Sequence, residues 1–192
     1  MTNGQPVNVV LASGSPRRRD LLSLLGVAFR TVAPDVDETP LHAEAPAELV
    51  ARLAAAKAAV VEGGIVIAAD TVVDVDGHVF AKPVDDVDAR RMLAALSGRT
   101  HHVHTGLAVR RGNATVVEVV TTAVTFVPLE PGDIDWYVAT GEPADKAGAY
   151  AMQGVGGQFV ASVHGSPSNV VGLPLDVLVR LLDLRRESGS GR

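Results

Sequence analysis

The 192-residue chain contains no cysteine, few aromatic side chains (4%) and no long apolar run. The missing thiols exclude disulfide scaffolds, cysteine nucleophiles and thiolate zinc sites, and they leave the redox compartment open. No stretch of about 18 apolar residues suggests a membrane span, and residues 1–5 have neither the basic nor the apolar region of a signal peptide. We therefore expect no membrane partner and a cytoplasmic location.

Acidic residues outnumber basic ones, 22 to 17, which gives a net charge of -5 beside a hydrophobic content of 47%. This balance argues against a protein that coats nucleic acid, although a local basic patch can still hold phosphates. The length fits one compact domain or two closely joined lobes. We expect a single domain over residues 1–187 and a flexible tail over 188–192.

Short β-branched runs alternate with segments of helical spacing in the first half of the chain. Strands are expected at residues 7–12, 29–33, 65–69, 101–109 and 115–126, with a hairpin over 72–80 that turns at Asp76-Gly77. Helices are expected from Pro16 up to Gly26 and at 46–61, 87–96, 131–140 and 175–186. This order predicts an α/β fold with a mixed sheet and flanking helices.

A phosphate-binding loop is one interpretation of residues 13–19 (SGSPRRR), which lie between a predicted strand and a predicted helix. Amides at a helix N-terminus attract anions, glycine permits their close approach, and the arginine fork matches phosphate oxygens. The loop lacks the ending of a Walker A motif and the glycine spacing of a dinucleotide fingerprint. A capped surface helix with three solvated arginines is about equally consistent with the spacing.

Asp70 follows the buried run 65–69, where open α/β sheets place binding groups. Its carboxylate can hold a divalent metal or accept a proton from water, and Thr71 can orient a substrate; alternatively, both residues cap a turn. Glu38 belongs to a second acidic group, which as an isolated run is more typical of solvated loops.

Two lysines, Lys57 on a predicted helix and Lys82 after the hairpin, are unremarkable individually. Together with Arg17 and Arg18 in one cleft they would supply the positive charge that a triphosphate requires. Spacing alone does not establish that these four side chains converge.

The glycine-rich segment 146–173 predicts tight turns and close backbone approach rather than disorder. Within it, Gln153 either reads the edge of a nucleobase with its amide or bonds to nearby backbone as a turn residue. The histidines at 101, 102 and 104 favour a sheet surface over a metal site, because 101 faces away from the other two on an alternating strand.

Eight segments in series together resemble the Maf family of nucleoside triphosphate pyrophosphatases over residues 7–183. The segments are 11–18, 37–38, 52–58, 69–73, 82–83, 97–106, 145–154 and 169–174. The resemblance implies hydrolysis between the α- and β-phosphates of a nucleoside triphosphate, giving the monophosphate and pyrophosphate with a divalent cation (Mg, Mn or Co). It also implies a twisted mixed sheet with two lobes around a deep cleft, similar to inosine triphosphate pyrophosphatases, and a homodimer.

Residue by residue, the resemblance assigns Asp70 as proton acceptor in a catalytic group with Lys57 and Lys82. It assigns substrate binding to the positions Ser13, Arg17, Arg18, Thr71 and Gln153. Glu38 and Asp70 are the candidate metal ligands, and Glu38 is an alternative base if Asp70 holds the metal. Among the branches, the pattern of Arg17, Thr71 and Gln153 is similar to the one acting on dTTP and UTP.

Two other functions compete with this one. The first is a nucleotide-binding regulator of cell division or septum formation in which hydrolysis is slow, a role that has been attached to the family. The second is a metal hydrolase built on the histidines at 101, 102 and 104, which predicts that His102→Ala and His104→Ala abolish activity.

Overall fold

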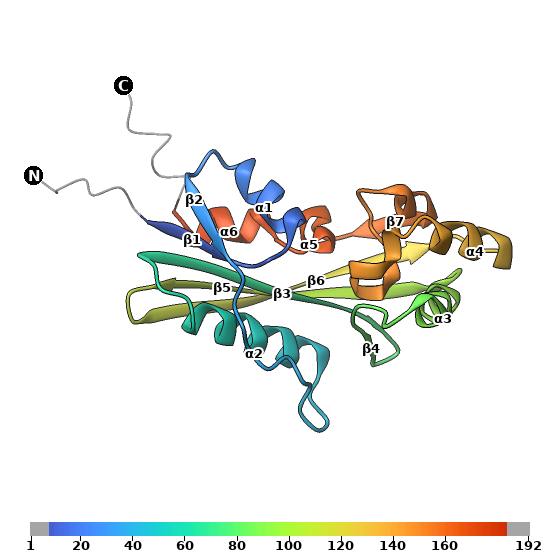
Figure 1. Cartoon of the computed structure of the whole chain (residues 1–192), viewed down its shortest axis with the longest axis horizontal. Helices are drawn as coiled ribbons and strands as arrows, with labels where there is room; N and C mark the ends of the chain where they lie inside the picture. Colours follow the sequence, from blue (N-terminus) through green and yellow to red (C-terminus); the bar gives the residue numbers. More distant parts are fainter. Residues whose placement is uncertain (1–7, 184–192) are drawn as a thin grey trace, which may run out of the picture.

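A computed structural model of the chain describes residues 8–183, in an elongated molecule with a single sheet along its length (Figure 1). The strands are β1 (Val9–Ala12), β2 (Phe29–Val32), β3 (Ile65–Val75), β4 (His78–Phe80), β5 (Thr100–Arg111), β6 (Ala114–Phe126) and β7 (Val160–His164). The helices are α1 (Pro16–Ser23), α2 (Pro46–Ala59), α3 (Asp86–Leu96), α4 (Pro131–Ala139), α5 (Pro167–Val171) and α6 (Leu175–Leu181). Three short 3-10 turns, η1 (Glu142–Asp145), η2 (Ala147–Ala149) and η3 (Val155–Phe159), complete the fold.

The sheet is mixed, with the strand order β2-β1-β3-β5-β6-β7 and β4 paired to the far part of β3. β1 runs parallel to both β2 and β3, whereas every other pairing is antiparallel. The predicted mixed sheet with flanking helices is therefore confirmed.

Side chains alternate between the two faces of the sheet, as the period of two in a strand requires. Leu11 and Ile67 pack under α1 and α6 on one face, while Val10 and Val66 pack under α2 on the other. Figure 1 shows α1, α5 and α6 on one side of the sheet and α2 on the opposite side. With β1 and β2, these helices form what we call the sheet lobe.

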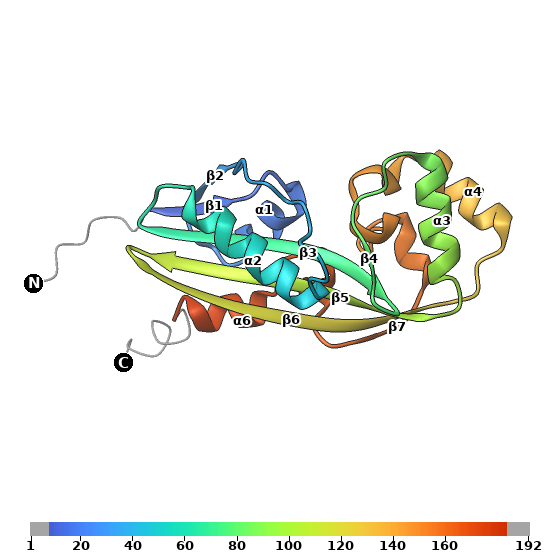
Figure 2. The same cartoon turned by 90° about the horizontal axis from the view of Figure 1, so that it is seen from below.

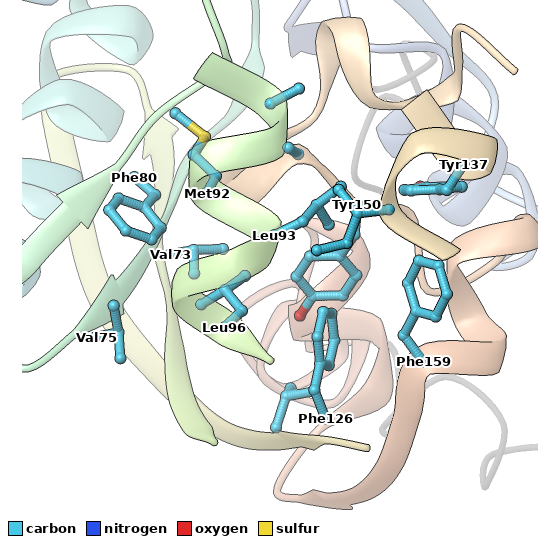
Figure 3. Packing of buried hydrophobic residues seen from close by; sticks show 14 of the residues in the cluster. Val73, Val75, Phe80, Met92, Leu93, Leu96, Phe126, Tyr137, Tyr150 and Phe159 are labelled. Carbon is cyan, nitrogen blue, oxygen red and sulfur yellow. The ribbon is translucent and has the colours of Figure 1, made fainter. Parts of the chain in front are cut away.

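The second lobe comprises β4, α3, α4, η1–η3 and β7, and it closes over the ends of β3, β5 and β6 (Figure 2). Its core gathers most of the chain's aromatic side chains around Phe126, which makes edge-to-face contacts with His101 and Tyr150 at centroid distances of 4.9 and 4.8 Å (Figure 3). Such pairs add packing energy beyond the area they bury. We call this part the aromatic lobe.

One strand prediction is wrong. The strand expected to end at Asp70-Thr71 continues to Val75, because both residues pair with β5, opposite Gly106 and Thr105. Neither residue caps a turn.

Two short elements inside the glycine-rich segment, β7 and α5, were not predicted from the sequence. The hairpin at Asp76-Gly77 is confirmed, since both residues have positive φ. The predicted tail at 188–192 and the last residues of the helix predicted at 175–186 lie outside the described residues. Between residues 8 and 183, none of the helices is long and apolar enough to cross a membrane.

Candidate active site

The site lies where one edge of β3 has no neighbouring strand. β1 pairs with β3 only as far as Ala68, and β4 begins to pair at Val73. Within the described chain, residues 69–72 are therefore unpaired along that edge. Asp70 and Thr71 occupy this gap at the carboxyl end of β1, which is where open α/β sheets bind ligands, although they lie within a strand rather than after one.

A cleft of about 640 Å³ opens at this gap between the two lobes. It brings together all but one of the residues that the sequence singled out. The predicted residues that line it are Ser13, Arg17, Arg18, Glu38, Lys57, Asp70, Thr71 and Lys82. Five basic and three acidic side chains line the cleft, so its charge balance is opposite to that of the whole chain. Such a cleft attracts polyanionic ligands.

Asp70 is held by an ammonium group. Lys57 Nζ lies 2.6 Å from Asp70 Oδ1 and 2.7 Å from Glu38 Oε1, so one cation bridges two carboxylates. The side chains of Lys57 and Asp70 are only 8% and 10% exposed, whereas that of Glu38 is 59% exposed. A nearly buried charge pair keeps Asp70 ionised and fixes its orientation toward the cleft.

Gly106 allows α2 to lie close enough for this contact. It pairs with Asp70 on the neighbouring strand, and a Cβ added there would overlap the backbone carbonyl of Val50 on α2. The glycine thus sets the height of the helix above the sheet and lets Lys57 reach Asp70.

Arg18 is anchored on three sides. Its Nε donates to the carbonyl of Gly172 (2.8 Å), Nη2 to Thr71 Oγ1 (2.9 Å) and Nη1 to Ser13 Oγ (3.4 Å). Burial lowers the pKa of the Arg18 guanidinium, and the Asp70 carboxylate opposes that shift. Within the described chain, two of its five N–H groups are left to bind an anion.

The hydroxyl of Thr71 has a fixed direction. Thr105 Oγ1 donates to the carbonyl of Asn169 (3.2 Å), so the 2.9 Å bond between the two threonines is donated by Thr71. Thr71 therefore accepts from Arg18 and has no proton left for a ligand. It acts by positioning Arg18.

Arg17 reaches across the cleft to the aromatic lobe. Its two terminal nitrogens donate to the side chain and to the backbone carbonyl of Asp145, at 3.1 and 3.2 Å. Lys146, beside Asp145, also lines the cleft and donates to the carbonyl of Glu142 (3.2 Å). Sequence reasoning did not select Asp145 or Lys146 as site residues, and only their position ahead of the glycine-rich segment pointed to them.

Lys82 and Gln153 differ in their placement. Lys82 is exposed, lines the cleft from the side of the aromatic lobe, and has no carboxylate within ion-pair distance among residues 8–183. Gln153 is also exposed, but only its neighbours Ala151 and Met152 line the cleft. The structure does not bring Gln153 together with the other predicted residues.

The candidate metal ligands offer two carboxylates and no third ligand. Glu38 and Asp70 converge on one point, the ammonium group of Lys57. No cluster of three or more His, Asp or Glu side chains suited to a metal occurs in the part of the chain that the structure describes. Two carboxylate oxygens fit a cation such as Mg²⁺, which takes its remaining ligands from water and substrate phosphates.

The three histidines do not form a common site. His101 is fully buried and its Nε2 lies 2.9 Å from Tyr150 Oη, so its expected place on the sheet surface was wrong. Burial lowers the pKa of His101 to about 4, with a small contribution from His102. His102 is exposed and His104 is half-buried beside Asp74, outside the cleft.

Comparison with protein families matches residues 8–185 to the family described as Maf-like protein. Because the match spans nearly the whole chain, the protein belongs to the Maf family. Its fold and its basic cleft thus have the setting that the sequence motifs implied.

Curated relatives narrow this further. The chain is 58% identical to a dTTP/UTP pyrophosphatase of Anaeromyxobacter sp., covering 91% of this chain and 87% of the relative. It is 51% identical to a dTTP/UTP pyrophosphatase of Symbiobacterium thermophilum, covering 91% and 92%. A solved structure, that of the Staphylococcus aureus Ham1 protein, is 16% identical with a TM-score of 0.46, over 62% of this chain and 71% of that one.

Proposed function

We propose that this protein is a nucleoside triphosphate pyrophosphatase that hydrolyses the α–β phosphate bond of dTTP and UTP. The observation that carries the proposal is the single, nearly buried carboxylate of Asp70 at the floor of a cleft with basic walls. Relatives at 51–58% identity that bear the name dTTP/UTP pyrophosphatase support the substrate class.

In the proposed reaction, Asp70 accepts a proton from a water molecule whose oxygen attacks the α-phosphorus. The bond from that phosphorus to the bridging oxygen breaks, and pyrophosphate leaves with the electron pair. Lys57 holds Asp70 in place, and Arg18 offers its two remaining N–H groups to phosphate oxygens. Lys82 supplies further positive charge from the opposite wall.

A divalent cation completes the proposed site. Glu38 and Asp70 would hold it together with phosphate oxygens of the substrate, since their carboxylates converge. When bound, Mg²⁺, Mn²⁺ or Co²⁺ neutralises charge on the triphosphate. If Asp70 serves mainly as its ligand, Glu38 takes the role of base.

The test combines product analysis with a matched pair of variants. The purified chain is incubated with each divalent cation and a panel of nucleoside triphosphates in H₂¹⁸O. We expect label in the monophosphate, and phosphate release only after inorganic pyrophosphatase is added. Asp70→Asn is expected to lower kcat by about 10³-fold.

Asp74→Asn is the control, because Asp74 lies on the same strand and face but outside the cleft. We expect it to retain activity within about twofold. Direct release of phosphate, or full activity of Asp70→Asn, would overturn the proposal. Slow hydrolysis with tight nucleotide binding would instead favour a regulator of cell division, a role that the names of the relatives do not favour.

The homodimer, the cytoplasmic location and the selection of the base by Gln153 stay predictions from the family resemblance. Light scattering of the purified chain tests the first. A Gln153→Glu variant with unchanged base preference would contradict the third.

A further inference from the structure

We infer that Glu142 and Tyr137 are positioning residues for nucleobase selection, an inference that rests on the proposed function. Both belong to the aromatic lobe, and neither lines the cleft. They act through the loop of residues 151–157, which forms part of the cleft rim and carries Gln153.

A set of five polar contacts fastens this loop to η1 and α4. Glu142 Oε2 accepts from the amide of Val155 and Oε1 from that of Gly156, both at 2.9 Å. Tyr137 Oη donates to Glu142 Oε1 (2.7 Å) and accepts from the amide of Ala151 (3.1 Å). Lys146 Nζ donates to the carbonyl of Glu142. One carboxylate and one phenol thus hold both ends of the loop.

The glycines of the loop make room for this arrangement. A Cβ on Gly154 would overlap the Glu142 carboxylate, and a Cβ on Gly156 would overlap Tyr137 Oη. A third glycine, Gly157, leaves no space for a Cβ against the carbonyl of Met152. The glycine-rich sequence here therefore serves a tight fit between loop and clamp rather than mobility.

The electrostatics of the clamp favour an ionised carboxylate. Burial alone would raise the pKa of Glu142, but the amides of Gly156 and Val155, the Tyr137 hydroxyl and the Lys146 ammonium together lower it. The phenol is correspondingly kept protonated, because burial and the adjacent carboxylate raise the pKa of Tyr137. The donor and acceptor roles in the clamp are therefore fixed at neutral pH.

This rim suits the nucleoside end of the substrate. The charged groups Arg17, Arg18 and Lys57 lie on the sheet lobe, whereas Ala151 and Met152 bring neutral, partly apolar surface to the cleft. A rigid neutral rim can discriminate among bases by shape and hydrogen bonding, because a displaced contact is then not recovered by movement.

The test uses Tyr137→Phe and Glu142→Gln, with Glu130→Gln as the control. Tyr137→Phe keeps the edge-to-face packing on Phe159 (5.0 Å), so it removes only the hydroxyl. Glu130 is an exposed carboxylate of the same lobe. For both clamp variants we expect the preference in kcat/KM for dTTP over CTP to fall by about tenfold, mainly through KM.

Hydrolysis of a base-free deoxyribose 5-triphosphate should stay within twofold of the parent, since the clamp does not touch the phosphate site. Hydrogen exchange of the Val155 and Gly156 amides should accelerate in the variants. Calorimetric binding of α,β-methylene dTTP and CTP measures the same preference without turnover. An inactive parent protein therefore contradicts the proposed function alone. Unchanged preference despite faster amide exchange, or an equal loss in Glu130→Gln, overturns this inference.

Discussion

The two lobes hold the cleft by different means. In the sheet lobe, site residues are fixed by charge: Lys57 bridges two carboxylates, and Arg18 is anchored by three hydrogen bonds. In the aromatic lobe, the walls rest on a packed core that contains both tyrosines and three of the four phenylalanines. An uncommon residue type is therefore concentrated where long regular elements are scarce. Rings supply there the buried area that helices and strands supply elsewhere.

The strongest way to break this contrast is to remove the central ring of the aromatic core. Phe126→Ala deletes a ring that contacts both His101 and Tyr150, so we expect a loss of about 3–5 kcal/mol in unfolding free energy. Urea titration gives the value. Trp136→Ala, at an aromatic residue that is 53% exposed on the same lobe, is expected to cost less than about 1 kcal/mol. Similar losses in the two variants would refute the importance of this core.

The corresponding change in the sheet lobe is Gly106→Ala. Because the new Cβ overlaps the Val50 carbonyl, we expect a loss of about 3 kcal/mol together with lower kcat, as α2 moves away from Asp70. Gly132→Ala, in a helix with no atom near the added Cβ, is the matched control and should be neutral or slightly stabilising. If Gly106→Ala retained parental stability and activity, the close approach of α2 would not matter.

Acid should weaken the aromatic lobe through His101. Its pKa is about 4 in the folded protein against 6.5 for the ordinary group, so the unfolded chain binds more protons between these values. Stability then falls as pH falls from 6.5 toward 4, by about 2 kcal/mol at pH 5 from this group. Urea titrations from pH 7.5 to 5 measure the slope. His101→Asn should flatten it, whereas the exposed His164→Asn should leave it unchanged.

The smallest effect concerns the ion pair that crosses the cleft. Asp145→Ala removes a partly exposed partner of Arg17, so we expect a loss below about 1 kcal/mol that shrinks in high salt. Asp135→Ala breaks a similar pair with Arg90 inside the aromatic lobe and should cost about as much. A loss above 2 kcal/mol for Asp145→Ala alone would mean that this pair, rather than the shared strands, joins the lobes.

Most helices and strands were predictable, because hydrophobic period, proline and glycine act locally. The extent of β3 was not, since Asp70 remains in a strand only through its pairing with β5, far along the chain. The same holds for β7, a five-residue strand within glycine-rich sequence that depends on β6. Local signals do not report such pairings.

The site shows the same division. Residue chemistry and spacing selected Arg18, Lys57 and Asp70, but their convergence depends on a packing distance that Gly106 sets. The donor direction of Thr71 was beyond prediction as well, because it follows from Thr105 and a backbone carbonyl of the α5 segment.

The unbroken course of β3, β5 and β6 through both lobes limits how this chain can vary over evolutionary time. Inserting one residue into β5 between His101 and Gly106 would turn the following or preceding side chains to the opposite face. Such an insertion would disturb either the aromatic core or the seat of α2. Changes in length are therefore tolerated at turns such as Gly112-Asn113, and the lobes are inherited together rather than exchanged as modules.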